Sequence, residues 1–295
     1  MKQLCIPRII FQTWKTHSVP EKWKTSPESI KTFMPSWKHV LFDDSENQAF
    51  VEKHFPEYID FYKKLKFPIQ RADFIRYCFL YINGGVYSDL DIEFIAPIDD
   101  LFVMKNNTKS KSSQKVGQDE DAEKEAKAEK EAKAEAEAEA KVFLLKAPQN
   151  FAGHYTNFFM ASTARNPFWL IVLRECVEKL PPWVILPHNI ISEQTGLACI
   201  SRAVKKAKTE NQTSIEILPF QNLVPCDVCS TPSEYKRRPY FYTKFLKGGS
   251  WNGLDTHIFN TVLCNRLEVM FFLGFVIACV VFRFFLQKRQ NAFIL

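Results

Sequence analysis

Hydrophobic residues recur at helical spacing from residue 68 to residue 82 and then give way to a short run typical of a strand. Pro68 stands at a favourable first position of a helix, and the apolar stripe that follows comprises Ala72, Ile75, Phe79 and Ile82. The Asn-Gly-Gly sequence at 83–85 supplies a left-handed helix stop. Residues 86–92 include Val, Tyr and Ile, which favour a strand. The pattern therefore predicts a helix, a glycine turn and a strand in succession.

Two carboxylates stand at the end of the expected strand. Asp89 and Asp91 are two residues apart, and side chains two apart on a strand point to the same side. Their hard oxygen atoms suit Mg²⁺ or Mn²⁺, and a metal held there can neutralise a diphosphate leaving group. Asp73 and Arg76 lie together on the flank of the helix stripe. A lone Asp-x-Asp is common by chance, so the preceding helix and double glycine carry the prediction of a metal site.

The whole string from residue 70 to residue 91 resembles the glycosyltransferases whose sugar-binding region contains the DXD motif. The residues that carry this likeness are Asp73, Arg76, Gly84, Gly85, Tyr87, Asp89 and Asp91. The family comprises retaining enzymes of the GT-A fold, similar to glycosyltransferase family 32, and includes the catalytic subunit of mannosyl inositol phosphorylceramide synthase. The resemblance implies that Asp89 and Asp91 hold the metal. It places the other five residues in the site of a nucleotide-sugar donor.

Two further segments resemble the same family. Residues 6–14 look like its first strand, and the resemblance implies that Trp14 stacks on the nucleotide base. The Gly-Ser-Trp near the end is similar to a family motif in which Ser250 helps to bind the metal and Trp251 contacts the β-phosphate. The departures from the family pattern are Phe11 in place of His, Leu197 in place of Pro, and Lys244-Phe245 where relatives often carry His.

Strands alternate with helical patterns through the first hundred residues, which predicts an α/β fold with a mostly parallel sheet. The resemblance makes this a GT-A type nucleotide-sugar-binding domain. A second strand is expected within 36–44 and a helix over 46–55. One catalytic domain is expected to comprise residues 1–104 and 142–265. Ligands of such sheets bind at the carboxyl ends of the strands, where Trp14 and the two carboxylates are expected.

Residues 105–141 differ from the rest and are expected to form a charged, low-complexity insertion in a surface loop. Residues 119–141 contain ten acidic residues and five lysines, a net charge of −5. The charge of the whole chain is +6, so the remainder carries +11. A basic surface suits anionic nucleotide sugars and anionic membranes. No nucleic-acid-binding motif is present, which disfavours nucleic acid as a partner.

The C-terminal region predicts a membrane anchor. Residues 267–286 are apolar except for Glu268 and Arg283, and they reach the length of a single transmembrane helix if these two charges lie near the two interfaces. A basic tail follows at 287–295. A buried core helix is the alternative. The basic tail favours a lumenal catalytic domain, whereas the first ten residues lack the apolar region of a signal peptide, so the side of the membrane stays open. An ER or Golgi type membrane is expected. The lone Cys226-x-x-Cys229 pair indicates a loop feature rather than a zinc site.

These features predict a metal-dependent retaining hexosyltransferase that uses Mn²⁺ or Mg²⁺. The donor is expected to be GDP-mannose or a UDP-hexose, with mannose favoured, and the acceptor a membrane glycolipid or glycan. The likeness to a catalytic subunit adds a regulatory subunit to the expected partners. A catalytically inactive, membrane-anchored binding protein of the same fold is the alternative. A phosphoryl-transfer enzyme whose active-site motif begins with Asp-x-Asp is disfavoured. That motif usually has Thr or Val two residues after the second Asp, and this chain has Glu93 there.

Overall fold

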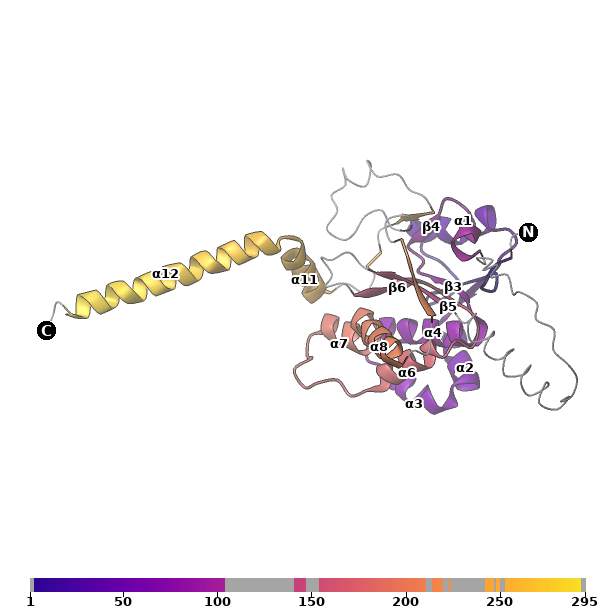
Figure 1. Ribbon diagram of the computed structural model, residues 1–295, viewed down its shortest axis with the longest axis horizontal. Helices are drawn as coiled ribbons and strands as arrows, with labels where there is room; N and C mark the ends of the chain where they lie inside the picture. The colour runs from indigo at the N-terminus through magenta and orange to yellow at the C-terminus, as the bar shows by residue number, and fades with distance from the viewer. Residues whose placement is uncertain are drawn as a thin grey trace, which may run out of the picture.

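A six-stranded sheet forms the centre of the computed structural model (Figure 1). The structure describes residues 3–103, 141–146, 154–210, 214–219, 223, 242–246, 248–249 and 253–292. The strands are β1 (Ile9–Thr13), β2 (Lys38–Phe42), β3 (Gly85–Ser88), β4 (Ile92–Phe94), β5 (Lys141–Lys146), β6 (Tyr155–Ser162), β7 (Ser214–Leu218) and β8 (Thr243–Phe245). The helices are α1 (Thr25–Phe33), α2 (Asp44–His54), α3 (Ile59–Lys64), α4 (Pro68–Asn83), α6 (Phe168–Val177), α7 (Pro187–Gln194), α8 (Leu197–Glu210), α11 (Leu254–Cys264) and α12 (Arg266–Ala292), with short 3₁₀ helices at Glu21–Trp23, Pro56–Tyr58 and Asp99–Phe102.

The strand order is β2-β1-β3-β6-β5-β7, and the sheet is mostly parallel. β1 pairs in parallel with β2 and β3, and β5 pairs in parallel with β7. β6 alone among these strands runs antiparallel to its neighbours, β3 and β5. β4 and β8 form a separate antiparallel pair. The predicted α/β class with a mostly parallel sheet is therefore confirmed.

Each face of the sheet is covered by its own hydrophobic core. Helices α4, α6 and α8 pack on one face, where Phe11 and Tyr87 are buried. Ile10 and Val86, their neighbours in sequence, point to the other face and pack under α1 and β4. This alternation follows from the two-residue period of a strand. Figure 1 shows α2, α3, α4, α6 and α8 below the sheet and α1 with β4 above it.

The strand order reverses direction at β1. The connection from β1 to β2 runs through α1 on one face, and the connection from β2 to β3 runs through α2 to α4 on the other. A crevice forms outside the carboxyl ends of the two strands that flank such a reversal. Here these ends are Thr13 on β1 and Ser88 on β3. The fold therefore places a ligand crevice beside both Trp14 and Asp89.

Helix α4 begins at Pro68 and ends before two glycines, as the sequence predicts. Gly84 and Gly85 have φ angles of 64° and 84°, a region that L residues with a side chain rarely adopt. A Cβ on Gly84 would lie 2.5 Å from the backbone nitrogen of Ala164, and one on Gly85 would lie 2.5 Å from the carbonyl oxygen of Ile9. Both glycines therefore allow α4 to turn directly into the central strand β3.

Helix α12 projects away from the domain and is joined to it through α11 (Figure 1). Within the described part of the chain, no single helix meets the length and hydropathy expected of a membrane span. Leu254–Cys264 and Arg266–Ile277, which meet at an angle of 88°, satisfy those criteria only as a pair. The structure therefore does not identify the single span predicted at 267–286, and the bend lies just before that stretch, at Asn265. Residues 104–140, most of the predicted insertion, lie outside the described residues.

Candidate functional site

The two carboxylates of the Asp-x-Asp motif follow β3 instead of lying on it. β3 ends at Ser88, and Asp91 lies in a turn in which the backbone N–H of Ile92 donates to the carbonyl of Asp89 over 3.2 Å. The prediction of one strand over 86–92 is therefore wrong. The chain leaves the main sheet at this turn because β4 pairs with β8. The turn, and not strand alternation, brings both carboxylates into the same pocket.

Arg76 of α4 holds the carboxylate of Asp89 in place. Its side chain is only 2% exposed and forms ion pairs with Asp73 (3.0 Å) and Asp89 (3.3 Å). The guanidinium lies 4.3 Å from the centre of the Tyr87 ring, and the Tyr87 hydroxyl donates to Asp89 Oδ1 over 2.5 Å. Burial, the largest single influence, lowers the pKa of Arg76, but the neighbouring groups, including both carboxylates, together raise it above its usual value. Arg76 therefore stays charged and fixes Asp89 in one orientation.

Asp73 shares this buried network with polar groups of β6 and of the end of α7. Its Oδ1 accepts from Asn157 Nδ2 over 2.9 Å, and its Oδ2 accepts from the hydroxyl of Thr195 over 3.0 Å. The Tyr77 hydroxyl donates to the backbone carbonyl of Thr195 over 2.5 Å. Burial raises the pKa of Asp73 to about 7, while Arg76 acts in the opposite direction. Asp73 and Arg76 both line the pocket, but much of their hydrogen-bonding capacity is already used within this network of protein groups.

Asp91 is the carboxylate with spare capacity. Its Oδ1 is buried and has no hydrogen-bond partner among the residues that the structure describes. Burial and the charge of Asp89 raise the pKa of Asp91 to about 7. Buried polar atoms in proteins nearly always have a partner, so an exception calls for an explanation. A divalent cation provides one, since carboxylate oxygens are the ligands that Mg²⁺ and Mn²⁺ prefer.

The loop after β8 closes over Asp91. The backbone N–H of Leu246 donates to the Asp91 carbonyl over 2.7 Å. A Cβ on Gly248 would lie 1.6 Å from Asp91 Oδ2, so only glycine fits beside this carboxylate. Gly249 has a φ of 89°. Ser250 and Trp251, which the resemblance assigns to the metal and the donor, lie outside the described residues.

A second polar network supports the turn from the sheet side. Gln12 of β1 donates to the Ser26 hydroxyl (2.9 Å) and to the carbonyl of Asp89 (3.4 Å), and Ser26 donates to the carbonyl of Ile92 (2.6 Å). The His39 ring contacts Gln12 Oε1 at 3.0 Å, and burial lowers the pKa of His39 to about 4. Sequence reasoning missed the role of Ser26, which no motif marks. Buried Gln12, in the middle of an apolar strand, was the available signal.

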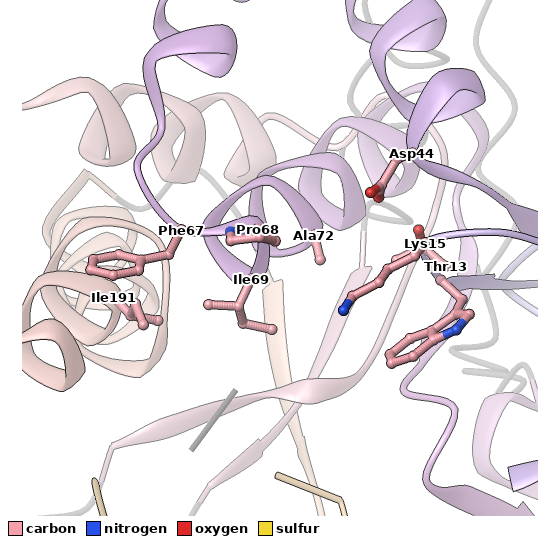
Figure 2. A pocket seen from close by; sticks show the side chains of 9 residues that line it. Thr13, Lys15, Asp44, Phe67, Pro68, Ile69, Ala72 and Ile191 are labelled. Carbon is pink, nitrogen blue, oxygen red and sulfur yellow. The ribbon is translucent and has the colours of Figure 1, made fainter. Parts of the chain in front are cut away.

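A second pocket lies next to the first at the end of β1. It is lined by Trp14, Lys15 and Asp44, with Ile69 facing Lys15 across it (Figure 2). Ile69 and Ile191 line both pockets, so the two are adjacent parts of one cleft. Trp14 therefore lies in the same cleft as the two carboxylates.

Helices α7 and α11 supply a wall of the carboxylate pocket that sequence reasoning did not find. His188 and Ser192 of α7 line it together with Thr256 and Asn260 of α11. The His188 ring nitrogen Nδ1 contacts the Thr256 hydroxyl at 3.2 Å. Gly84 and Gly85, by contrast, lie at the opposite end of β3 from Asp89 and line neither pocket. The structure does not bring these glycines to the site, and their close contacts give them a structural role.

Comparison with known proteins gives a family match over part of the chain. Residues 20–112 match the family model described as the glycosyltransferase sugar-binding region containing the DXD motif. The resemblance is confirmed. The matched segment contains α4, β3 and the Asp89–Asp91 turn.

Curated relatives extend the similarity beyond that region. Mannosyl phosphorylinositol ceramide synthase SUR1 of Saccharomyces cerevisiae is 26% identical over 99% of this chain and 62% of its own length. Inositol phosphoceramide mannosyltransferase 1 of Schizosaccharomyces pombe is 23% identical over 97% of this chain and 76% of its own length. A solved glycosyltransferase domain of the YGT toxin is 8% identical, with a TM-score of 0.46 over 72% of this chain and 81% of that one. The chain spans only about three fifths of SUR1.

Replacement of Gly248 by Ala is expected to weaken metal binding and transfer by about tenfold or more, because the new Cβ pushes Asp91 out of position. Isothermal titration with Mn²⁺ measures the first effect and donor turnover the second. Gly274→Ala is the matched control, since a Cβ there meets nothing within 4 Å. Equal Mn²⁺ affinity in both variants would contradict the role of Asp91 in metal binding.

Proposed function

We propose that the chain is a metal-dependent retaining glycosyltransferase of the GT-A type that moves a hexose, with mannose favoured, from a nucleotide sugar to a membrane glycolipid or glycan. The main support is the unpartnered Oδ1 of Asp91, which lies beside Asp89 in a pocket at the β1/β3 crevice. The family match and the mannosyltransferase names of the relatives support the reaction class.

Each part of the cleft has a task in this proposal. Trp14 stacks on the nucleotide base in its own part of the cleft, and the diphosphate lies toward Asp89 and Asp91. A bound Mn²⁺ or Mg²⁺ supplies positive charge against the leaving diphosphate. Burial raises the pKa of Asp89, and Arg76 acts in the opposite direction and keeps this carboxylate oriented. By resemblance, Ser250 and Trp251 complete the metal and phosphate contacts, and Asp73 and Tyr87 belong to the donor site.

The C-terminal helices and one relative support the proposed acceptor and location. The alignment with SUR1 covers 99% of this chain, and SUR1 is named as a mannosyl phosphorylinositol ceramide synthase. Consecutive apolar residues on α12, such as Met270 to Leu273, are all exposed, so the helix offers apolar side chains in every direction. We propose that α12 anchors the domain to an ER or Golgi membrane and that a regulatory subunit accompanies it.

A catalytically inactive binding protein stays the second candidate, because two departures from the family pattern line the pocket. Leu197 and Phe245 both face the carboxylate site. The third departure has no such consequence. Phe11 is fully buried in the core and stacks on Phe79 at 3.9 Å, so it removes no polar group from the cleft.

The test uses purified full-length protein with radiolabelled GDP-mannose, UDP-glucose or UDP-galactose and extracted lipids. Label is expected to enter the organic phase from one donor, and a variant carrying Asp89→Asn and Asp91→Asn is expected to give none. Thermal stabilisation by a donor without any turnover would support the binding-protein alternative, because a bound ligand raises stability by mass action. Label found only as free sugar or on soluble protein would refute the lipid acceptor.

Mn²⁺ affinity is expected to increase as the pH rises from about 6 to about 8, by about tenfold per unit below the pKa of Asp91. A carboxyl must lose its proton before it binds a cation, and the pKa of Asp91 is raised to about 7. In the metal-free protein the same raised pKa lowers the free energy of unfolding as the pH rises from about 4 to about 7. Calorimetric titration at several pH values measures the affinity. An affinity that is independent of pH would contradict the assignment.

A further inference from the structure

The loop between α6 and α7 exposes a compact group of large apolar side chains. Trp183 is 77% exposed, Ile185 73% and Leu186 51%. No Asp, Glu, Lys or Arg occurs from residue 180 to residue 192. Exposed apolar side chains that lie next to one another on a soluble domain usually mark an interaction site. The loop therefore needs a partner with an apolar surface.

This loop continues directly into an interface with α11. The backbone N–H of His188, at the start of α7, donates to Asp255 Oδ2 over 2.7 Å. The His188 ring stacks on Phe259 with 4.6 Å between ring centres. α11 itself exposes Leu254, Ile258, Phe259 and Val262. The apolar loop and the apolar side of α11 thus belong to neighbouring elements that are fixed to each other.

The same elements border the carboxylate pocket. His188 and Ser192 of α7 and Thr256 of α11 line the pocket that holds Asp89 and Asp91. Figure 1 shows the loop before α7 on the same side of the domain as α11 and α12. An apolar surface therefore lies beside the pocket wall, on the side from which the apolar helix α12 projects.

We propose that Trp183, Ile185 and Leu186, together with the exposed apolar side chains of α11, form a membrane-docking surface that enters the interfacial layer of a lipid bilayer. This docking proposal rests on the proposed function in one respect, namely that the acceptor is a membrane lipid. Docking holds the α7/α11 wall of the pocket against the head-group layer, so that acceptor head groups reach the pocket at high local concentration.

Three observations favour a bilayer over a protein partner. The surface is continuous through α11 with α12, and the pair α11 and α12 jointly meets the hydropathy of a membrane span. The most exposed of the large apolar side chains in the loop is a tryptophan, the side chain that is enriched where membranes meet water. The loop is short and bounded by Pro181, Pro182 and Pro187, which restrict its backbone and suit shallow insertion.

The first test measures insertion without relying on activity. Full-length protein is reconstituted into phosphatidylcholine–phosphatidylinositol vesicles with and without brominated lipid, which quenches tryptophan emission inside the bilayer. Wild-type emission is expected to be quenched, and most of that quenching is expected to be lost in Trp183→Phe. Quenching that is unchanged by Trp183→Phe would show that Trp183 lies outside the bilayer, which would overturn the proposal. The same result is expected if this surface binds a protein instead of a lipid bilayer.

The second test asks whether docking delivers the acceptor. A variant carrying Trp183→Ser, Ile185→Ser and Leu186→Ser is compared with wild type on lipid acceptor in vesicles and in detergent micelles. Transfer in vesicles is expected to fall about tenfold or more, while transfer in micelles, where docking is not needed, stays within about twofold. Ile217→Ser, at an exposed apolar position on β7, is the control and is expected to match wild type in both.

The outcomes separate this proposal from the proposed function. Wild-type protein that transfers no sugar in either medium contradicts the glycosyltransferase, and the quenching test still decides docking. Equal transfer by wild type and the triple variant in vesicles overturns the docking surface and leaves the enzyme standing. Loss of transfer in both media by the triple variant also counts against docking, since these side chains would then be needed even in micelles, where docking is not.

Discussion

Replacement of Asp91 by Asn is expected to reduce sugar transfer by about 100-fold or more while leaving the fold intact. The amide keeps the shape of the side chain but removes the negative charge that a divalent cation requires. The carboxylate it replaces has one oxygen without a protein partner, so little structural hydrogen bonding is lost. Donor turnover in saturating Mn²⁺ measures the effect, and excess chelator is expected to reduce wild type to the same level.

The matched control is Asp60→Asn, which removes the same charge from an exposed position on α3 that lines neither pocket. Its turnover is expected to equal that of wild type. The thermal unfolding midpoint of Asp91→Asn, in the absence of metal, is expected to be equal to or above that of wild type, because a carboxyl with a raised pKa is replaced by a neutral group. Full transfer by Asp91→Asn, or by wild type in chelator, would disprove the metal mechanism.

The largest effect on stability is expected from Arg76→Met. The guanidinium is the counter-charge of the buried Asp73 carboxylate and of the partly exposed Asp89 carboxylate, and its replacement takes this cation from both. Breaking a buried ion pair from one side costs about 3–5 kcal/mol of unfolding free energy. Urea denaturation monitored by circular dichroism measures this loss.

A double-mutant comparison tests the physical reason for that loss. Arg76→Met combined with Asp73→Asn is expected to be more stable than Arg76→Met alone, because one of the two stranded charges is gone. The stabilising effect is expected to disappear below about pH 4, where the Asp73 carboxyl is protonated in the folded and unfolded chains. A double variant that is less stable than Arg76→Met at neutral pH would show that Arg76 acts through packing and not through charge.

Short-range patterns predicted the elements around the site well. The boundaries of α4 followed from Pro68 and the double glycine, and β1 lies within residues 6–14, the segment that resembles the first strand of the family. Strand propensity gave the wrong structure for residues 89–92. Ile92 belongs to a different strand because it pairs with Phe245, far along the chain. No local pattern in either segment encodes that partnership.

The contribution of each residue to the site was harder to predict than its presence. Asp73 and Arg76 were expected to contact the donor, and that role stays a prediction. The structure shows them 3% and 2% exposed and engaged with each other. Burial depends on everything that packs around a helix, including Asn157 and Thr195 from the second half of the chain. A motif fixes the residue type, whereas the surrounding chain decides whether it meets a ligand or supports a neighbour.

The pairing of β4 with β8 has a consequence for the order in which the protein acquires its activity. Glu93 and Lys244, which form an ion pair across these strands, are 151 positions apart. A ribosome releases the Asp89–Asp91 turn long before it makes the strand that closes over it. The nascent chain consequently emerges with its carboxylates uncovered, and the proposed metal site is completed only when translation has passed Gly249. A chain truncated before β8 therefore contains all six strands of the central sheet but lacks the segment that closes over the carboxylates.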